Sequence, residues 1–103
     1  MYARSLTFKA SADQREKIEA LASSMAEVMQ SLRGFVDLHY LVSEDATEYA
    51  SISFWLTKDD AQAAGELLRD RALKQVETLA TEPPRITVYE VYEPQSGWQA
   101  KAS

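Results

Sequence analysis

Residues 35–56 read FVDLHYLVSEDATEYASISFWL, and this stretch decides the fold class. Two runs rich in β-branched and aromatic residues, 35–42 and 48–56, flank the polar segment 43–47. Such runs are typical of strands, and a five-residue polar connection between them indicates a β-hairpin. The sequence therefore predicts an antiparallel pair of strands at the centre of the chain.

An amphipathic helix is predicted before the hairpin. Between Ile18 and Leu32 apolar residues recur at three- and four-residue steps, which places them on one helical stripe. Ser11 stands three residues before Gln14, the spacing of a capping box that opens a helix. Gly34 follows the last apolar position and is expected to end the helix in a left-handed conformation.

A second amphipathic helix is predicted after the hairpin. Its apolar residues run from Ala61 to Leu79, and Thr57 with Asp60 repeats the capping-box spacing. Gly65 lies inside this pattern and is less favourable than Ala by about 1 kcal/mol. We therefore expect a kink or a break into two helices at Gly65.

Two further strand-like segments, 2–8 and 85–92, complete the order β-α-β-β-α-β. This order is that of the ferredoxin-like plan, an α+β fold with a four-stranded antiparallel sheet and both helices on one face. We expect one domain over residues 1–93. Residues 94–103, with Trp98 as the one apolar anchor, are expected to form a C-terminal tail.

Two helices cover only one face of such a sheet. A hairpin closed symmetrically about Asp45 directs three cross-strand pairs toward the helices, namely Val36 with Phe54, Leu38 with Ile52, and Tyr40 with Ala50. The other face then carries Phe35, Asp37, His39 and Leu41 opposite Trp55, Ser53, Ser51 and Tyr49, together with either Ile86 and Val88 or Tyr89 and Val91. A solvated sheet face is normally polar. The large apolar residues here predict a homodimer that packs this face against its copy.

Composition excludes several classes of function. Of the 103 residues, 11 are Lys or Arg and 16 are Asp or Glu, so the net charge of −5 is unfavourable for nucleic-acid binding. The chain has no Cys and one His, which argues against thiolate and multi-histidine metal sites, and no metal is expected. Neither a membrane-length apolar run nor a secretory signal is visible, so we expect no membrane partner and a cytoplasmic location.

A hydrolase triad is disfavoured, although its residue types are present. In the expected register Asp37 and His39 share a face with Ser51 and Ser53. Side chains two residues apart on a strand project in parallel, and no helix N-terminus or sharp turn supplies an oxyanion hole. These four residues are better interpreted as polar groups at a wet dimer interface.

Aromatic residues on the predicted strands offer a second interpretation. Most such residues form cores, but a pocket for a planar organic ligand needs the same side chains plus a polar group. Tyr40, Tyr49 and Trp55 are candidates for this pocket. His39 is the obvious proton acceptor near neutral pH. Arg71 is a candidate to orient an anionic or phenolate ligand, against the alternative of a solvated helix face.

Four segments carry a family resemblance: MYAR (1–4), LRGFV (32–36), SISFWLTKDDA (51–61) and VYEV (88–91). They resemble the antibiotic biosynthesis monooxygenase domain, which belongs to the dimeric α/β-barrel superfamily, over residues 1–93. The resemblance implies two ferredoxin-like sheets that face each other in a dimer, with the helices outside. Because its motifs are mostly structural, it supports the fold more strongly than an activity.

Several members of the resembled superfamily oxidise phenolic or quinol-type substrates with O₂ and no flavin, metal or haem. The resemblance therefore implies a cofactor-independent monooxygenase of a small aromatic or quinol substrate, with His39 or Tyr49 as acid/base and Tyr40 and Trp55 shaping the pocket. Haem degradation is disfavoured, because the chain contains no Asn and its second helix has neither Trp nor His. The alternative is a non-catalytic dimer that binds a small molecule or is purely structural.

Overall fold

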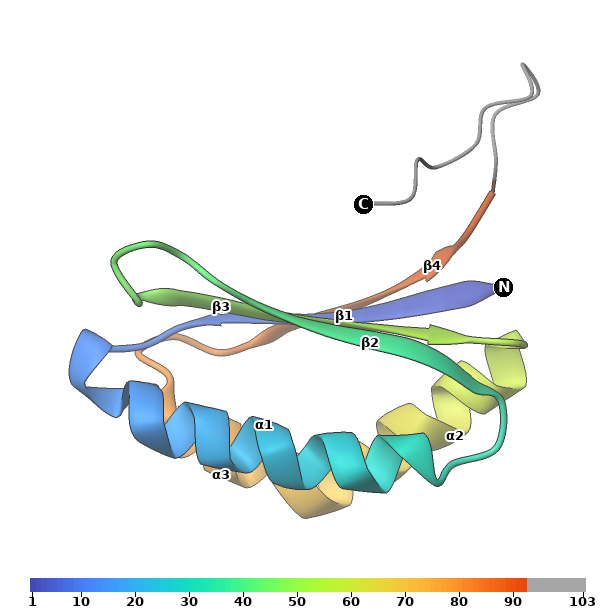
Figure 1. Cartoon of the computed structure of the whole chain (residues 1–103), viewed down its shortest axis with the longest axis horizontal. Coiled ribbons are helices and arrows are strands. Elements are labelled where there is room, and N and C mark those ends of the chain that lie inside the picture. Colours follow the sequence, from blue (N-terminus) through green and yellow to red (C-terminus); the bar gives the residue numbers. More distant parts are fainter. Residues whose placement is uncertain (93–103) are drawn as a thin grey trace.

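The computed structural model describes residues 1–92, so the predicted C-terminal tail with Trp98 lies outside the described residues. One sheet and a layer of helices make up this part of the chain (Figure 1). The element bounds in chain order are β1 Tyr2–Lys9, η1 Ala12–Gln14, α1 Arg15–Gln30, β2 Phe35–Val42, β3 Glu48–Trp55, α2 Lys58–Leu68, η2 Arg69–Leu73, α3 Lys74–Leu79 and β4 Arg85–Glu90.

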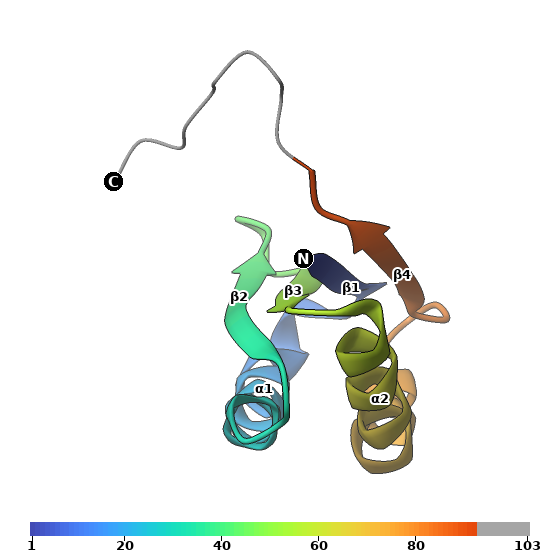
Figure 2. The same ribbon diagram turned by 90° about the vertical axis from the view of Figure 1, so that its right-hand side faces the viewer.

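The sheet has the strand order β2-β3-β1-β4, and each neighbouring pair is antiparallel. The two helical stretches lie side by side on one face, and the other face has no helix over it (Figure 2). This arrangement is the ferredoxin-like plan with βαββαβ order, as predicted. The hairpin loop occupies residues 43–47, which also agrees with the sequence-based expectation.

The expected pairing within the hairpin is wrong by one residue. Phe35 pairs with Trp55, but Asp37 pairs with Phe54 and His39 with Ile52, because Val36 is an extra residue at a β-bulge. Leu38 and Tyr40 still face the helices as expected. Relative to them, the one-residue shift turns every side chain of β3 to the face opposite to the expected one. The side chains of Trp55, Ser53, Ser51 and Tyr49 therefore face the helices. We call this helix-covered side the inner face and the opposite side the outer face.

The ends of the helices agree only in part with the expected capping. The Thr57 hydroxyl accepts from the backbone N–H of Asp60 at 3.1 Å, which confirms the cap of α2. Gly34 has a φ of +81°, the left-handed conformation expected after α1. Ser11 makes no side-chain cap, and the 3₁₀ turn η1 precedes α1 instead. The first capping box was therefore predicted wrongly.

The second helical stretch does not break at Gly65, contrary to expectation. It runs through Gly65 as α-helix, changes to the π-helical segment η2, and returns to α-helix in α3. A Cβ atom at Gly65 would lie 3.1 Å from Nε of Arg4, so the glycine leaves room for the arginine on the sheet below. The close approach of the Arg4 side chain to the helix, rather than a bend of the helix, explains the glycine at position 65.

Two clusters of buried side chains hold the helices on the sheet. The larger one is formed by Met29, Trp55, Ala61, Ala64 and Leu68, and the smaller one by Ala10, Ile18 and Tyr49.

Between residues 1 and 92 no helix is long and apolar enough to cross a membrane.

Candidate functional site

A cavity of about 280 Å³ lies between the helices and the inner face of the sheet. Its size is close to the lower end of the roughly 300–1,000 Å³ range of small-molecule sites. The sheet contributes Leu6 and Phe8 of β1, Ser51 of β3 and Ile86 of β4 to its lining. Most of the remaining wall comes from α1 and from the second helical stretch, through Ile18, Leu21, Ala22, Met25, Met29, Leu68, Ala72, Leu73 and Val76.

Tyr40 and Tyr49, both predicted as site residues, line this cavity. The Tyr40 hydroxyl donates to the carbonyl oxygen of Ala22 in α1 at 2.8 Å. Burial raises the pKa of the Tyr40 hydroxyl, which keeps it neutral at physiological pH. Tyr40 therefore links β2 to α1 and is suited to shaping the cavity rather than to removing a proton.

Tyr49 is buried and stacks on Phe8, with ring centroids 5.5 Å apart. Its hydroxyl is buried and makes no hydrogen bond within residues 1–92. A buried hydroxyl without a partner is uncommon, since such a group loses its hydrogen bonds to water on folding. The Tyr49 hydroxyl is thus an unpaired polar group enclosed in the wall of the cavity.

Arg4 and Arg69 also line the cavity, and the sequence analysis missed both. Arg4 lies on the inner face of β1 between Tyr2 and Leu6, and 7% of it is exposed. Burial, and secondly the charge of Arg69, lower the pKa of the Arg4 guanidinium. The signal was present in the alternation Tyr2-Arg4-Leu6, which places an arginine in an apolar row, but the sidedness of β1 is not evident from sequence.

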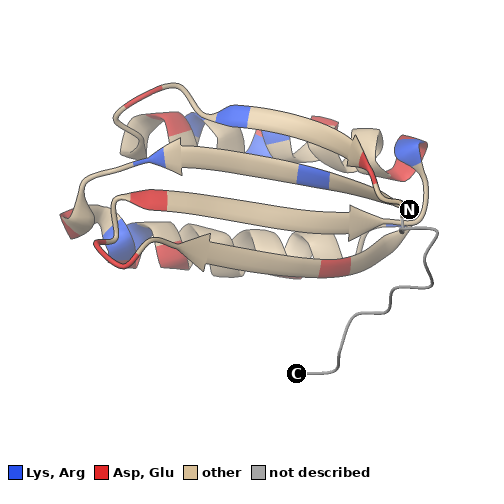
Figure 3. Ribbon diagram, turned by 90° about the horizontal axis from the view of Figure 1, so that it is seen from above, with Lys and Arg blue, Asp and Glu red and all other residues tan. Residues whose placement is uncertain are grey.

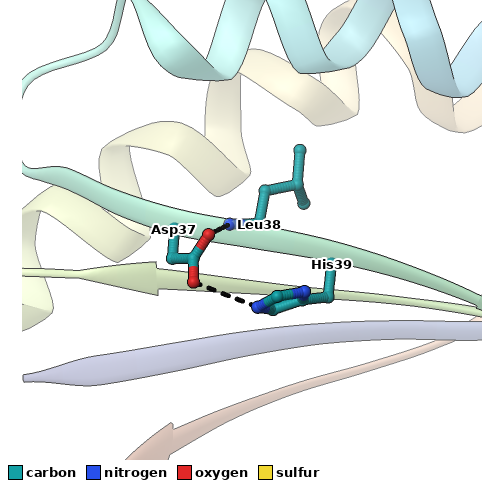
Figure 4. Close-up of polar contacts among 3 residues, drawn as sticks. All are labelled: Asp37, Leu38 and His39. Carbon is teal, nitrogen blue, oxygen red and sulfur yellow. Dashed lines mark hydrogen bonds and ion pairs between the residues drawn. The ribbon is translucent and has the colours of Figure 1, made fainter. Parts of the chain in front are cut away.

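The structure does not bring the other predicted site residues to the cavity. His39 lies on the outer face, where its Nε2 is 3.0 Å from Oδ2 of Asp37, and Leu38 between them points toward the helices (Figure 4). The backbone N–H of Leu38, and to a lesser extent His39, lower the pKa of the Asp37 carboxyl. The predicted grouping of His39 with Ser51 is therefore wrong, since Ser51 is on the inner face.

Trp55 and Arg71 are also separate from the cavity lining. Trp55 is fully buried, packs edge-on against Phe35, and donates from Nε1 to the Ser53 hydroxyl at 2.9 Å. Arg71 is exposed on η2 and does not line the cavity, although its neighbour Ala72 does. Across the described part of the chain, no group of three His, Cys, Asp or Glu side chains is arranged to hold a metal ion.

Solved structures show the same fold at low sequence identity. Rv0793 of Mycobacterium tuberculosis is 20% identical with a TM-score of 0.74, and the match covers 92% of this chain and 98% of that one. SnoaB of Streptomyces nogalater, described as a cofactor-independent oxygenase, is 18% identical (TM-score 0.72; 92% and 96% covered). The ActVA-Orf6 monooxygenase of Streptomyces coelicolor, solved with nanaomycin D, is 16% identical (TM-score 0.72; 97% and 92% covered).

The family of the protein is identified by sequence similarity. None of the curated proteins matches the chain. The family model for antibiotic biosynthesis monooxygenase matches residues 1–67, which include β1, α1, the hairpin and most of α2. This match spans more than half of the chain and covers three of the four strands that line the cavity. The protein therefore belongs to the antibiotic biosynthesis monooxygenase family.

Proposed function

We propose that the protein is a cofactor-independent monooxygenase that oxidises a small phenolic or quinol-type compound with O₂. The observation that carries the proposal is the apolar cavity of about 280 Å³ beneath the helices, in a chain of this family. Two solved structures of this fold support the same function, since one is described as a cofactor-independent oxygenase and the other as a monooxygenase with bound nanaomycin D. The small volume favours a substrate of few rings.

The proposed reaction needs no external reductant. Loss of a proton to water from an anthrone-type substrate leaves an electron-rich anion, which transfers electrons to O₂ and forms a carbon–oxygen bond. The resulting peroxide anion takes a proton back from water and becomes a hydroperoxide. Loss of water from that hydroperoxide converts the CH₂ carbon to a carbonyl. The substrate loses four electrons and O₂ gains four, so one oxygen atom enters the product and the other leaves as water.

The chain contributes binding and orientation in this scheme. We assign to Tyr49 the role of hydrogen-bonding the substrate oxygen, because its buried hydroxyl has no other partner between residues 1 and 92. Tyr40, on the neighbouring strand β2, shapes the same sheet wall and is held by its hydrogen bond to Ala22. His39 faces away from the cavity and Trp55 is enclosed by its own cluster, so the proposed reaction involves neither.

Oxygen uptake with a panel of hydroquinones and anthrone-type phenols tests this proposal. We expect uptake above the uncatalysed rate, and a loss of about tenfold to a hundredfold in Tyr49→Phe, as the loss of one hydrogen bond to a charged substrate oxygen should produce. Lys17→Ala, exposed on α1 and outside the cavity lining, is the matched control. Uptake no faster than the uncatalysed rate across the panel contradicts the proposal.

His39→Ala belongs in the same assay, because sequence reasoning alone favoured this histidine as the base. Since its ring lies on the outer face, we expect uptake close to that of the unaltered protein. A loss as large as that of Tyr49→Phe would return His39 to the reaction and argue against the assignment of the cavity as its site.

A binding protein without turnover is the second candidate. One observation favours it: among residues 1–92 no histidine lines the cavity, and the Glu19 carboxylate in the lining is already bound by Arg15. A ligand that raises the melting temperature without any oxygen uptake would support this function, because binding to the folded state alone stabilises it.

We further infer that the outer face forms a homodimer interface. Leu41 and Tyr89 are each 53% exposed on this face, with Ile52 and Phe54 between them. Most of the length of the strands is uncharged (Figure 3), although Asp37 of β2 lies on this face beside His39. An antiparallel sheet exposed to water normally carries polar residues on its open face. The large apolar side chains of Leu41, Ile52, Phe54 and Tyr89 among the polar ones therefore favour a second copy as its cover.

Sedimentation velocity at micromolar concentration tests the dimer. We expect a species of twice the 11.6 kDa chain mass, and dissociation in Leu41→Glu, because each chain would bury a carboxylate in the inferred interface. Thr78→Glu adds the same charge on the exposed helical surface and should leave the dimer intact. A monomer for the unaltered chain would contradict the inferred interface.

A further inference from the structure

Within residues 1–92, Arg4 is a buried cation without a counter-charge. Its exposed fraction is 7%, and its side chain makes no hydrogen bond or ion pair to any residue of the described 1–92 segment. A guanidinium group stays protonated in proteins, so it cannot escape burial by losing its charge. Burying one unpaired ion costs several kcal/mol. The position therefore calls for a compensating interaction.

The surroundings of Arg4 make the missing partner more specific. Gly65 leaves space for its Nε atom beside α2, so the side chain is held between the sheet and the helix. Arg69, one turn further along, adds a second positive charge whose influence on Arg4 is unfavourable. Glu19 is the one carboxylate in the cavity lining, and Arg15 already binds it at 2.7 Å.

Two arginine residues thus line a largely apolar cavity, in a chain whose net charge is −5. An acidic residue nearby would have been the simple way to neutralise Arg4, and the cavity lining has none that is free. An arginine binds a carboxylate through two parallel N–H···O bonds, and these charge-assisted bonds are about twice as strong as neutral ones. A carboxylate on a bound ligand would satisfy Arg4 in this way.

We propose that Arg4, assisted by Arg69, forms a carboxylate-binding subsite, so that the ligand of the cavity is an aromatic acid. This inference rests on the proposed function in one respect, that the cavity is the ligand site. The carboxylate pairs with the Arg4 guanidinium at the α2 side, and the ring system occupies the apolar space that reaches toward Leu6 and Tyr49.

Calorimetric titration with 2-naphthoate and 2-naphthamide tests the subsite, because the two compounds share shape and differ in charge. We expect the unaltered protein to bind the acid at least about tenfold more tightly than the amide, as a charge-assisted pair should provide. Arg4→Met should remove this preference and leave amide affinity unchanged. Lys74→Met removes one positive charge outside the lining and should keep the preference.

Arg4→Met carries a second readout that a structural role would not produce. Removing an unpaired buried charge should raise the melting temperature of the ligand-free protein, whereas an arginine needed for packing would lower it on removal. Arg69→Met is an exposed substitution that should fold in any case, and we expect a smaller loss of acid preference of about threefold. Together these variants test the subsite even if one of them is unstable.

The outcomes separate the subsite from the proposed reaction. Selective binding of naphthoate without oxygen uptake on any phenol supports the subsite and rejects the monooxygenase. Uptake on neutral phenols together with equal affinity for acid and amide rejects the subsite and keeps the monooxygenase. The inference is also overturned if neither naphthalene compound binds, or if Arg4→Met keeps the preference for the acid.

Discussion

The space between helices and sheet is filled at one end and hollow at the other. At the closed end, Trp55 is fully buried among Met29, Ala61, Ala64 and Leu68. At the open end, the same two layers enclose the cavity of about 280 Å³. The two ends share the same strands and the same helical stretch, so the difference arises from side chains rather than from topology.

The side chains on the inner face of β3 explain why one end is packed and the other is hollow. In order along the strand, this face carries Tyr49, Ser51, Ser53 and Trp55, so two serines lie between two aromatic residues. Ser53 is sealed at the closed end, where its hydroxyl accepts from Trp55 and donates to the Arg4 carbonyl at 3.3 Å. Ser51 lines the cavity, where it lies in the same hollow as Ala72 of η2. Small residues on both layers leave the space empty.

The π-helical geometry of η2 coincides with the open end. Arg69, Ala72 and Leu73 of this segment all contribute to the cavity lining. Short π-helical turns within α-helices occur frequently at functional sites. The change of helical geometry thus sits where the structure has a cavity, and regular α2 covers the closed end.

Removing the indole at the closed end should have the largest effect. Trp55→Ala would leave a cavity among Met29, Ala64 and Leu68 and should lower the free energy of unfolding by about 3–5 kcal/mol. Urea denaturation followed by circular dichroism measures this change. A loss below about 1 kcal/mol would mean that the closed end is not the stabilising core that its burial indicates.

The same substitution at the two ends should have opposite effects. Ala64→Leu adds volume to the packed cluster and should cost about 1–3 kcal/mol. Ala72→Leu adds it to the cavity and should be neutral or stabilise by about 0.5–2 kcal/mol, as cavity-filling changes do. Paired urea denaturation curves give the comparison, and equal losses for both variants would contradict the distinction.

Ligand binding provides a second comparison between Ala64→Leu and Ala72→Leu. Ala72→Leu should reduce the affinity for naphthamide, because the added methyl groups occupy the space that the ring needs. Ala64→Leu, if folded, should keep it. If Ala72→Leu binds the amide as well as the unaltered protein does, the ligand lies elsewhere.

The order of elements was predictable from the sequence, and the faces of the hairpin were not. Periodicity and polar turns located the strands and helices, because burial of apolar side chains imposes those patterns locally. The bulge at Val36 leaves no such pattern, yet it decides which side of β3 faces the helices. The predicted outer face therefore carried Ser51 and Ser53, where the structure has Ile52 and Phe54.

The candidate site was predictable to a lesser extent for the same reason. Tyr40 faces the helices as expected, because β2 keeps the expected alternation beyond the bulge. Arg4 was missed because the sidedness of β1 depends on its pairing with β3, a long-range contact. Gly65 was interpreted as a helix breaker, although its role is to admit the Arg4 side chain. Such roles depend on which elements meet, and this is decided by tertiary contacts.

The smallest expected effect concerns Tyr40 at the edge of the open end. Tyr40→Phe removes the hydrogen bond to the Ala22 carbonyl and should lower the free energy of unfolding by about 0.5–1.5 kcal/mol at neutral pH. The cavity remains, so naphthamide affinity should change little.

The pH dependence of Tyr40→Phe gives the more specific result. Burial raises the pKa of Tyr40 in the folded state above its ordinary value of about 10. Below pH 10 the hydroxyl is neutral in both states, and its stabilising contribution is complete. As the pH rises beyond 10, the unfolded chain ionises first, so the folded state loses this contribution until the folded pKa is passed. Tyr40→Phe should therefore show a shallower alkaline decrease in stability than the unaltered protein, and parallel curves would place the Tyr40 hydroxyl in water rather than against α1.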